Sequence, residues 1–143
     1  MTWRTRSFYG TFGAANLGLA LYGVLALLNP QILTDSFSAR VYQFPPEASA
    51  ALVYLAALFR LLGFFNLLVG ILGLWLLWRH WHHPQPWSER TVITVSLLAY
   101  LAPITFDNTV GHIGLFEILE HILFAAMLAV GMFQLFKRTD GNG

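Results

Sequence analysis

The chain has 143 residues, the length of a single domain, and a formal net charge of only +1. Hydrophobic residues make up 57% and charged residues 10%, with a mean hydropathy of +0.60, whereas soluble domains average about 25% charged residues. The small net charge argues against a nucleic-acid partner, and the absence of cysteine excludes disulfides, thiol nucleophiles and cysteine metal sites. We therefore expect an all-α integral membrane protein with one domain over residues 1–143.

Four segments are apolar enough to cross a bilayer, which takes roughly 20 residues of helix. We expect the first to be retained as a helix, because no small-residue cleavage site follows it. The connection over residues 29–46 is the only long one, and its aromatic content predicts a loop on the membrane surface. The four segments predict a four-helix bundle with spans at 8–28, 47–78, 88–106 and 112–136.

The distribution of Lys and Arg predicts the orientation of these spans. One set of flanks carries six basic residues and the opposite set carries only Arg40, so the positive-inside rule places both termini in the cytoplasm. Tryptophans lie near the same predicted face, as in an aromatic belt at lipid headgroups. The basic residues are Arg4, Arg6, Arg79, Arg90, Lys137 and Arg138, and the tryptophans are Trp3, Trp75, Trp78, Trp81 and Trp87.

Two of the predicted helices share a pattern of small residues around an asparagine. Gly13, Asn16 and Gly23 have the same spacing as Gly63, Asn66 and Gly73. At 100° per residue each set falls on one stripe of its helix. Small residues allow close helix crossings in lipid, and an asparagine can bond across such an interface. We expect the two helices to cross along these stripes, with the two asparagines either joining the helices or contacting a ligand.

The last predicted helix carries Glu117, Glu120 and His121 on one face. Ionisable groups in hydrocarbon are costly and normally face the bundle interior, where they find a partner. Arg60 is the only arginine deep inside a predicted span and lies at a similar counted depth, which predicts an ion pair with Glu120 or Glu117. Such a pair would leave the other of the two glutamates without a basic partner. The group is either a polar pocket or an internal ion pair that fixes helix register.

Asp107, Asn108 and His112 are expected in the short turn before that helix. Asp and Asn favour turns, and Asn108 or Thr109 could cap the helix. The alternative is that Asp107, Asn108 and His112 form the polar opening of the pocket below them.

A histidine cluster follows the second predicted helix, at His80, His82 and His83. A complete tetrahedral metal site would need a fourth ligand, for which Glu89 is the nearest candidate, so we expect a solvated loop and assign no metal. Haem needs two histidines on facing helices, and a di-iron bundle needs paired Glu-x-x-His motifs. A single chain provides neither, although a homodimer could restore a haem site, and the cofactor stays open.

The stretch from Arg60 to Asn66, with Gly70 and Gly73, resembles small DoxX-like four-helix bacterial membrane proteins. The resemblance covers mainly the first two predicted helices and implies no functional residues. A bacterial inner membrane, or a thylakoid-type one, is the expected location.

Three classes of function fit these residues. The first is a polar site that binds a small or lipophilic ligand or handles protons, in contact with the lipid bilayer and with homo-oligomerisation left open. The second is an intramembrane lipid isomerase or cyclase that uses Glu117, Glu120 or His121 for acid–base catalysis. The third is a structural or assembly subunit. The expected ligand-binding residues of the first class are Arg60, Asn66, Asn16, Glu117, Glu120, His121, Asp107 and His112.

Overall fold

A computed structural model describes residues 3–40, 42–45, 48–110 and 115–139, and these residues form five helices and no strand. Four of the helices are long and apolar enough to cross a membrane, which is consistent with a small multi-pass membrane protein. The helices are α1 (Trp3–Leu28), α2 (Pro30–Arg40), α3 (Ser49–His82), α4 (Pro86–Val110) and α5 (Leu115–Thr139).

The connection predicted as a loop contains the helix α2, so that prediction was wrong in its secondary structure. Proline is favoured in the first turn of a helix, because its missing N–H is not needed there, and α2 begins at Pro30. The Thr34 hydroxyl donates to the Pro30 carbonyl at 3.0 Å and is buried. Because α2 has only 11 residues, a search for membrane-length apolar segments passes over it.

The long helices extend beyond their predicted apolar segments at several ends. α1 begins at Trp3 rather than residue 8, and α4 continues to Val110 rather than residue 106. Backbone hydrogen bonds continue through polar residues, so hydropathy alone marks the helix ends poorly. α3 has 34 residues and is therefore about 50 Å long at 1.5 Å per residue. That length exceeds a hydrocarbon core of about 30 Å.

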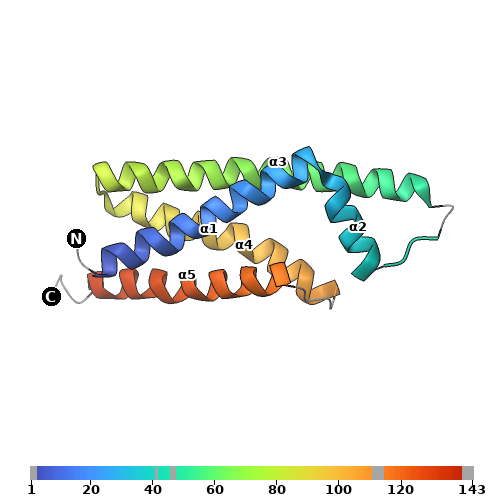
Figure 1. Ribbon diagram of the computed structural model, residues 1–143. Helices are drawn as coiled ribbons and strands as arrows, with labels where there is room; N and C mark the ends of the chain where they lie inside the picture. The colour runs from blue at the N-terminus through green and yellow to red at the C-terminus, as the bar shows by residue number, and fades with distance from the viewer. Residues whose placement is uncertain (1–2, 41, 46–47, 111–114, 140–143) are drawn as a thin grey trace.

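The four long helices form a bundle in which α3 and α5 are diagonal to each other (Figure 1). α1 packs against α3, α4 and α5, whereas no contact joins α3 to α5 within the described residues. We call the end where α1 begins and α5 ends the terminal end, and the opposite end the distal end. At the distal end α3 projects beyond α4 and α5, and α2 lies beside it.

The closest helix crossing is between α1 and α3, and it is made by glycines. A Cβ placed on Gly23 would lie 2.5 Å from the Leu67 backbone nitrogen and 2.6 Å from the Gly63 carbonyl oxygen. A Cβ on Gly70 would lie 2.6 Å from the Ala20 backbone nitrogen. Only glycine permits such an approach. The predicted crossing is confirmed at Gly23, Gly63 and Gly73, but Gly13 has nothing within 4 Å of its Cβ position.

The core lies where α1, α3, α4 and α5 meet. Its largest fully buried apolar side chains are Phe8, Phe12 and Met127. The outward faces are also apolar: on α3, Phe65 is 54% exposed and Ile71 is 53% exposed. Exposed apolar side chains along a long helix are expected where the solvent is lipid.

Candidate functional site

The predicted acidic residues come together at the distal end, in a group that we call the distal cluster: Asp107, Glu117, Glu120 and His121. Asp107 lies in the last turns of α4, and the other three lie in the first turns of α5. All four side chains are half-buried. Tyr22 of α1 lies close enough to the three carboxyl groups to interact with them electrostatically. The cluster therefore sits where α1, α4 and α5 meet.

Asp107 and Asn108 were predicted in a turn, and the structure places both in helix α4. The Asn108 Nδ2 donates to the Ile104 carbonyl at 2.7 Å, and the Thr109 hydroxyl donates to the Thr105 carbonyl at 2.7 Å. These side chains bond back to their own helix instead of capping the next one. The prediction that Asp107 joins the polar site is consistent with this geometry, whereas His112 lies outside the described residues.

The carboxyl groups of Asp107 and Glu120 lie within hydrogen-bonding range of each other. Two ionised carboxylates offer only acceptors, so a hydrogen bond between them requires a proton on one. Two oxygens in the cluster, Asp107 Oδ2 and Glu117 Oε2, are buried without a hydrogen-bond partner among the described groups. A buried polar atom without a partner is costly. A proton held between the acids would supply a missing donor.

His121 is held by two hydrogen bonds that orient its ring. Its Nδ1 lies 2.6 Å from the Glu117 carbonyl oxygen and therefore donates to it. Its Nε2 lies 3.2 Å from the Asn108 Nδ2 and therefore accepts from that amide. This pattern corresponds to the neutral tautomer with the proton on Nδ1. In this arrangement the imidazole places no positive charge beside the acids.

The predicted ion pair between Arg60 and Glu120 or Glu117 is wrong. Arg60 is exposed on α3, and α3 does not contact α5 in the described part of the chain. No ion pair between Arg60 and either acid is formed there. The depth comparison failed because α3 projects beyond α5 at the distal end (Figure 1). Equal distances from two helix ends therefore do not mean equal heights in the bundle.

The two predicted asparagines behave differently. Asn16 is fully buried, and its Nδ2 donates to the Ser96 hydroxyl at 2.9 Å and to the Phe12 carbonyl at 2.7 Å. A Cβ on Gly73 would overlap the Asn16 amide group. Asn66 is half-buried and bonds to no described group. The helices cross with Asn16 opposite Gly70 and Gly73, so the two asparagines do not meet.

Tyr100 adds a polar link between the middle of the bundle and the distal cluster. Its hydroxyl donates to the Ala15 carbonyl at 2.9 Å, and its side chain is 3% exposed. Its phenolic oxygen also lies close enough to Glu120 for the two groups to interact electrostatically. Ser88, Ser96 and Tyr100 are all buried, and successive members are four or eight residues apart on one stripe of α4.

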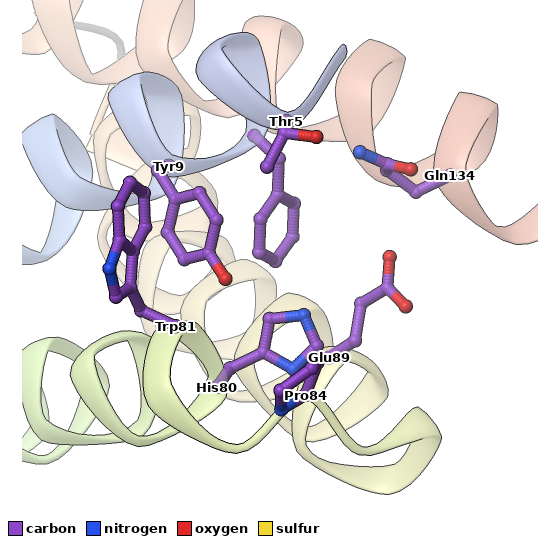
Figure 2. Close-up of a pocket in the computed structure, with 8 residues that line it drawn as sticks. Thr5, Tyr9, His80, Trp81, Pro84, Glu89 and Gln134 are labelled. Carbon is purple, nitrogen blue, oxygen red and sulfur yellow. The ribbon is translucent and has the colours of Figure 1, made fainter. Parts of the chain in front are cut away.

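The terminal end contains a cavity of about 430 Å³ that the sequence did not predict (Figure 2). We call it the aromatic cavity. α1, α3, α4 and α5 all contribute to it. Its polar lining residues are Thr5, Tyr9, His80, Glu89 and Gln134, and its apolar ones are Phe8, Trp81 and Pro84. Figure 2 shows the Tyr9 hydroxyl, the His80 ring and the Glu89 carboxylate around the same space.

His80 is oriented by α4. The Ser88 hydroxyl donates its hydrogen to the Gln85 carbonyl at 2.8 Å and so can only accept from His80 Nδ1, also at 2.8 Å. The other ring nitrogen, Nε2, is on the cavity side (Figure 2). Of these residues, only His80 and Glu89 are candidate site residues in the sequence, where they belong to an incomplete set of metal ligands. Tyr9 and Gln134 would have been found as polar residues near the same ends of two predicted spans.

The histidines at the end of α3 do not act together. His82 and His83 are exposed, and the His82 Nδ1 lies 2.9 Å from the Trp78 carbonyl oxygen of its own helix. Among the residues that the structure describes, no group of three or more His, Asp or Glu side chains is placed to hold a metal ion.

Comparisons with protein families, characterised proteins and solved structures found no match to the chain. The resemblance to DoxX-like proteins therefore stays a prediction, and any function has to be argued from the two sites.

Proposed function

We propose that the chain is a small multi-pass membrane protein whose distal cluster takes up and releases protons. The observation that carries the proposal is the pair of carboxyl groups of Asp107 and Glu120, which lie within hydrogen-bonding range of each other. Such a pair binds a proton between its oxygens. Glu117 and His121 beside it are titratable groups to which that proton could pass.

The charge balance of the cluster supports protons over a fixed ion pair. Three carboxyl groups are gathered there, and the two hydrogen bonds of His121 fit a neutral ring. Arg60 is exposed on α3, which does not contact α5 in the described part of the chain. Several unpaired anions close together in a half-buried site are costly. Bound protons remove that cost without any further basic residue.

Of the two alternatives, a structural subunit needs polar groups that are satisfied. Asp107 Oδ2 and Glu117 Oε2 have no partner among the described groups, which favours proton binding over a purely structural role. An intramembrane enzyme is the other candidate function for the same carboxyl groups, and it would need a cavity beside them.

Infrared spectroscopy of the purified protein tests the proposal, because a protonated carboxyl group and a carboxylate absorb separately. At neutral pH we expect a protonated carboxyl band that converts to carboxylate as the pH is raised. Glu120→Gln should remove the band, and Asp107→Asn should shift or remove it. Asp35→Asn is the matched control, because Asp35 is an exposed acid on α2. A band that is absent, or unchanged in both cluster variants, would refute proton sharing.

The proposal includes an orientation, with both termini in the cytoplasm and the distal cluster on the outer side. It is supported by the six basic residues that flank the spans at the terminal end. The chain has no cysteine, so single cysteines give clean labelling. Ala39→Cys on α2 and Gln85→Cys between α3 and α4 are both at exposed positions. In intact cells an impermeant maleimide should label only Ala39→Cys, and labelling of Gln85→Cys alone would reverse the orientation.

A further inference from the structure

We propose that the aromatic cavity at the terminal end binds an ammonium group. The inference is independent of proton handling at the distal cluster, since the two sites share no residue. It rests on three features of the cavity: aromatic rings at steep angles to one another, a single carboxylate, and hydrogen-bond acceptors from other helices.

Aromatic rings from α1 and α3 line the cavity and pack against one another at steep angles. The planes of Phe8 and Tyr9 meet at 77° with centroids 5.4 Å apart, and those of Tyr9 and Trp81 meet at 70° with centroids 4.8 Å apart. The His80 ring completes the arrangement at 70° to Phe8, with centroids 5.9 Å apart. Rings at such angles present several faces or edges to one occupant. A cage of aromatic faces is how proteins bind ammonium groups, because the ring quadrupole attracts a cation.

The charge of the cavity has the sign that a cation requires. Among the described residues that line it, Glu89 is the only acid and none is Lys or Arg. The Glu89 carboxylate is half-buried in the first turn of α4 and faces the cavity across from Tyr9 and Trp81 (Figure 2). An anion would meet this carboxylate. An uncharged apolar guest would offer this carboxylate neither an opposite charge nor a hydrogen-bond donor.

Two other helices contribute further oxygen atoms to the cavity. The Tyr9 and Thr5 hydroxyls are contributed by α1, and the Gln134 side chain by α5. The Gln134 Nε2 already donates to the Arg4 carbonyl at 3.5 Å, so its Oε1 is the amide atom available as an acceptor. An ammonium nitrogen inside the cavity can therefore meet both the carboxylate and neutral acceptors.

The ammonium group has two plausible sources, a lipid headgroup and a free amine. The cavity lies at the end of the bundle that carries exposed Trp78, Trp81 and Trp87, the residue type of membrane interfaces. A second, apolar cavity of about 230 Å³ adjoins it beyond Gln134, between α1 and α5. Both sources present the same chemistry to the cage, so the experiment separates them.

Calorimetric titration of the purified full chain tests the proposal, in a maltoside detergent and phosphate buffer free of amines. Choline and ethanolamine are the probes, and 3,3-dimethyl-1-butanol is the uncharged isostere of choline. We expect saturable binding of at least one amine and no response to the isostere. An equal response to the isostere, or no saturable response to either amine, would overturn the proposal.

Variants assign any binding to the cage. Glu89→Gln and Trp81→Leu should each weaken amine binding about tenfold. Trp87→Leu is the matched control, because Trp87 is 49% exposed at the same end, next to the Arg79 guanidinium, and does not line the cavity. If Glu89→Gln does not fold, Tyr9→Leu replaces it. Unchanged affinity in Trp81→Leu and in the second cage variant would overturn the proposal.

Native mass spectrometry identifies the source. The protein is reconstituted in nanodiscs of phosphatidylethanolamine and phosphatidylglycerol and then released. Retained phosphatidylethanolamine that free ethanolamine displaces makes the lipid headgroup the ligand. Calorimetric binding without lipid retention makes a free amine the ligand. Both results support the ammonium site, and the absence of both contradicts it.

Discussion

The α1–α3 crossing and the distal cluster hold their helices together in different ways. At the crossing, backbone meets backbone: Gly23, Gly63 and Gly70 leave no room for a single Cβ. At the distal cluster, α4 and α5 meet through polar side chains, among them the carboxyl groups of Asp107 and Glu120. The crossing therefore tolerates almost no change in side-chain size, whereas the proton binding that we propose for the cluster would change only contacts between polar side chains.

The largest expected effect is at the crossing. Gly23→Ala would place a Cβ against the backbones of Leu67 and Gly63, and such overpacking should cost about 1–3 kcal/mol. Gly13→Ala is the matched control on the same helix, because nothing lies within 4 Å of its Cβ position. Removing a helical glycine there should be neutral or stabilise by up to about 1 kcal/mol. Thermal unfolding in detergent measures both, and similar stabilities for the two variants would contradict the close crossing.

An intermediate effect is expected at the link between the two regions. Tyr100→Phe removes the hydrogen bond to the Ala15 carbonyl and should cost about 0.5–1.5 kcal/mol. Tyr54→Phe is the control, because Tyr54 is 67% exposed on α3, and it should change stability by less than about 0.5 kcal/mol. An equal loss in both variants would mean that the buried hydroxyl contributes nothing specific.

The same difference explains what the sequence could predict. Four long apolar helices and the crossing follow from hydropathy and from glycine spacing, since each depends on residues close together in one segment. Gly63 and Gly73 lie on one stripe whatever else the chain does. Gly13 shares the pattern, but nothing lies within 4 Å of its Cβ position, although Tyr9, one turn away, contacts Trp81 of α3.

Other features depend on how whole helices are placed. The partner of Arg60 could not be predicted, because the relative height of α3 and its diagonal position to α5 are properties of the assembled bundle. Asp107 has a turn-forming residue type, yet the helix continues through it. The aromatic cavity combines four helix ends, and its residues have no shared spacing. The cavity's histidine, His80, is followed in the sequence by His82 and His83, both of which are exposed. Nothing in that stretch distinguishes His80 from the exposed histidines.

The smallest expected effect is at Arg60, and it separates the observed packing from the predicted ion pair. In the structure Arg60 is an exposed residue of α3, on a helix that does not touch α5 in the described region. Arg60→Leu should therefore change stability by less than about 0.5 kcal/mol, as for other exposed positions. A buried pair would instead lose roughly 3–5 kcal/mol, because its acid would be stranded.

A double-mutant cycle makes this comparison independent of the single losses. Thermal unfolding of Arg60→Leu, Glu120→Gln and the double variant should give a coupling energy near zero, because groups without shared contacts contribute additively. The positive control is the cycle of Asp107→Asn with Glu120→Gln, whose carboxyl groups lie within hydrogen-bonding range. Its coupling should be about 0.5 kcal/mol or more. Coupling above about 1 kcal/mol between Arg60 and Glu120 would restore the ion pair. It would also remove the charge argument for protons, because the cluster would then have a basic partner.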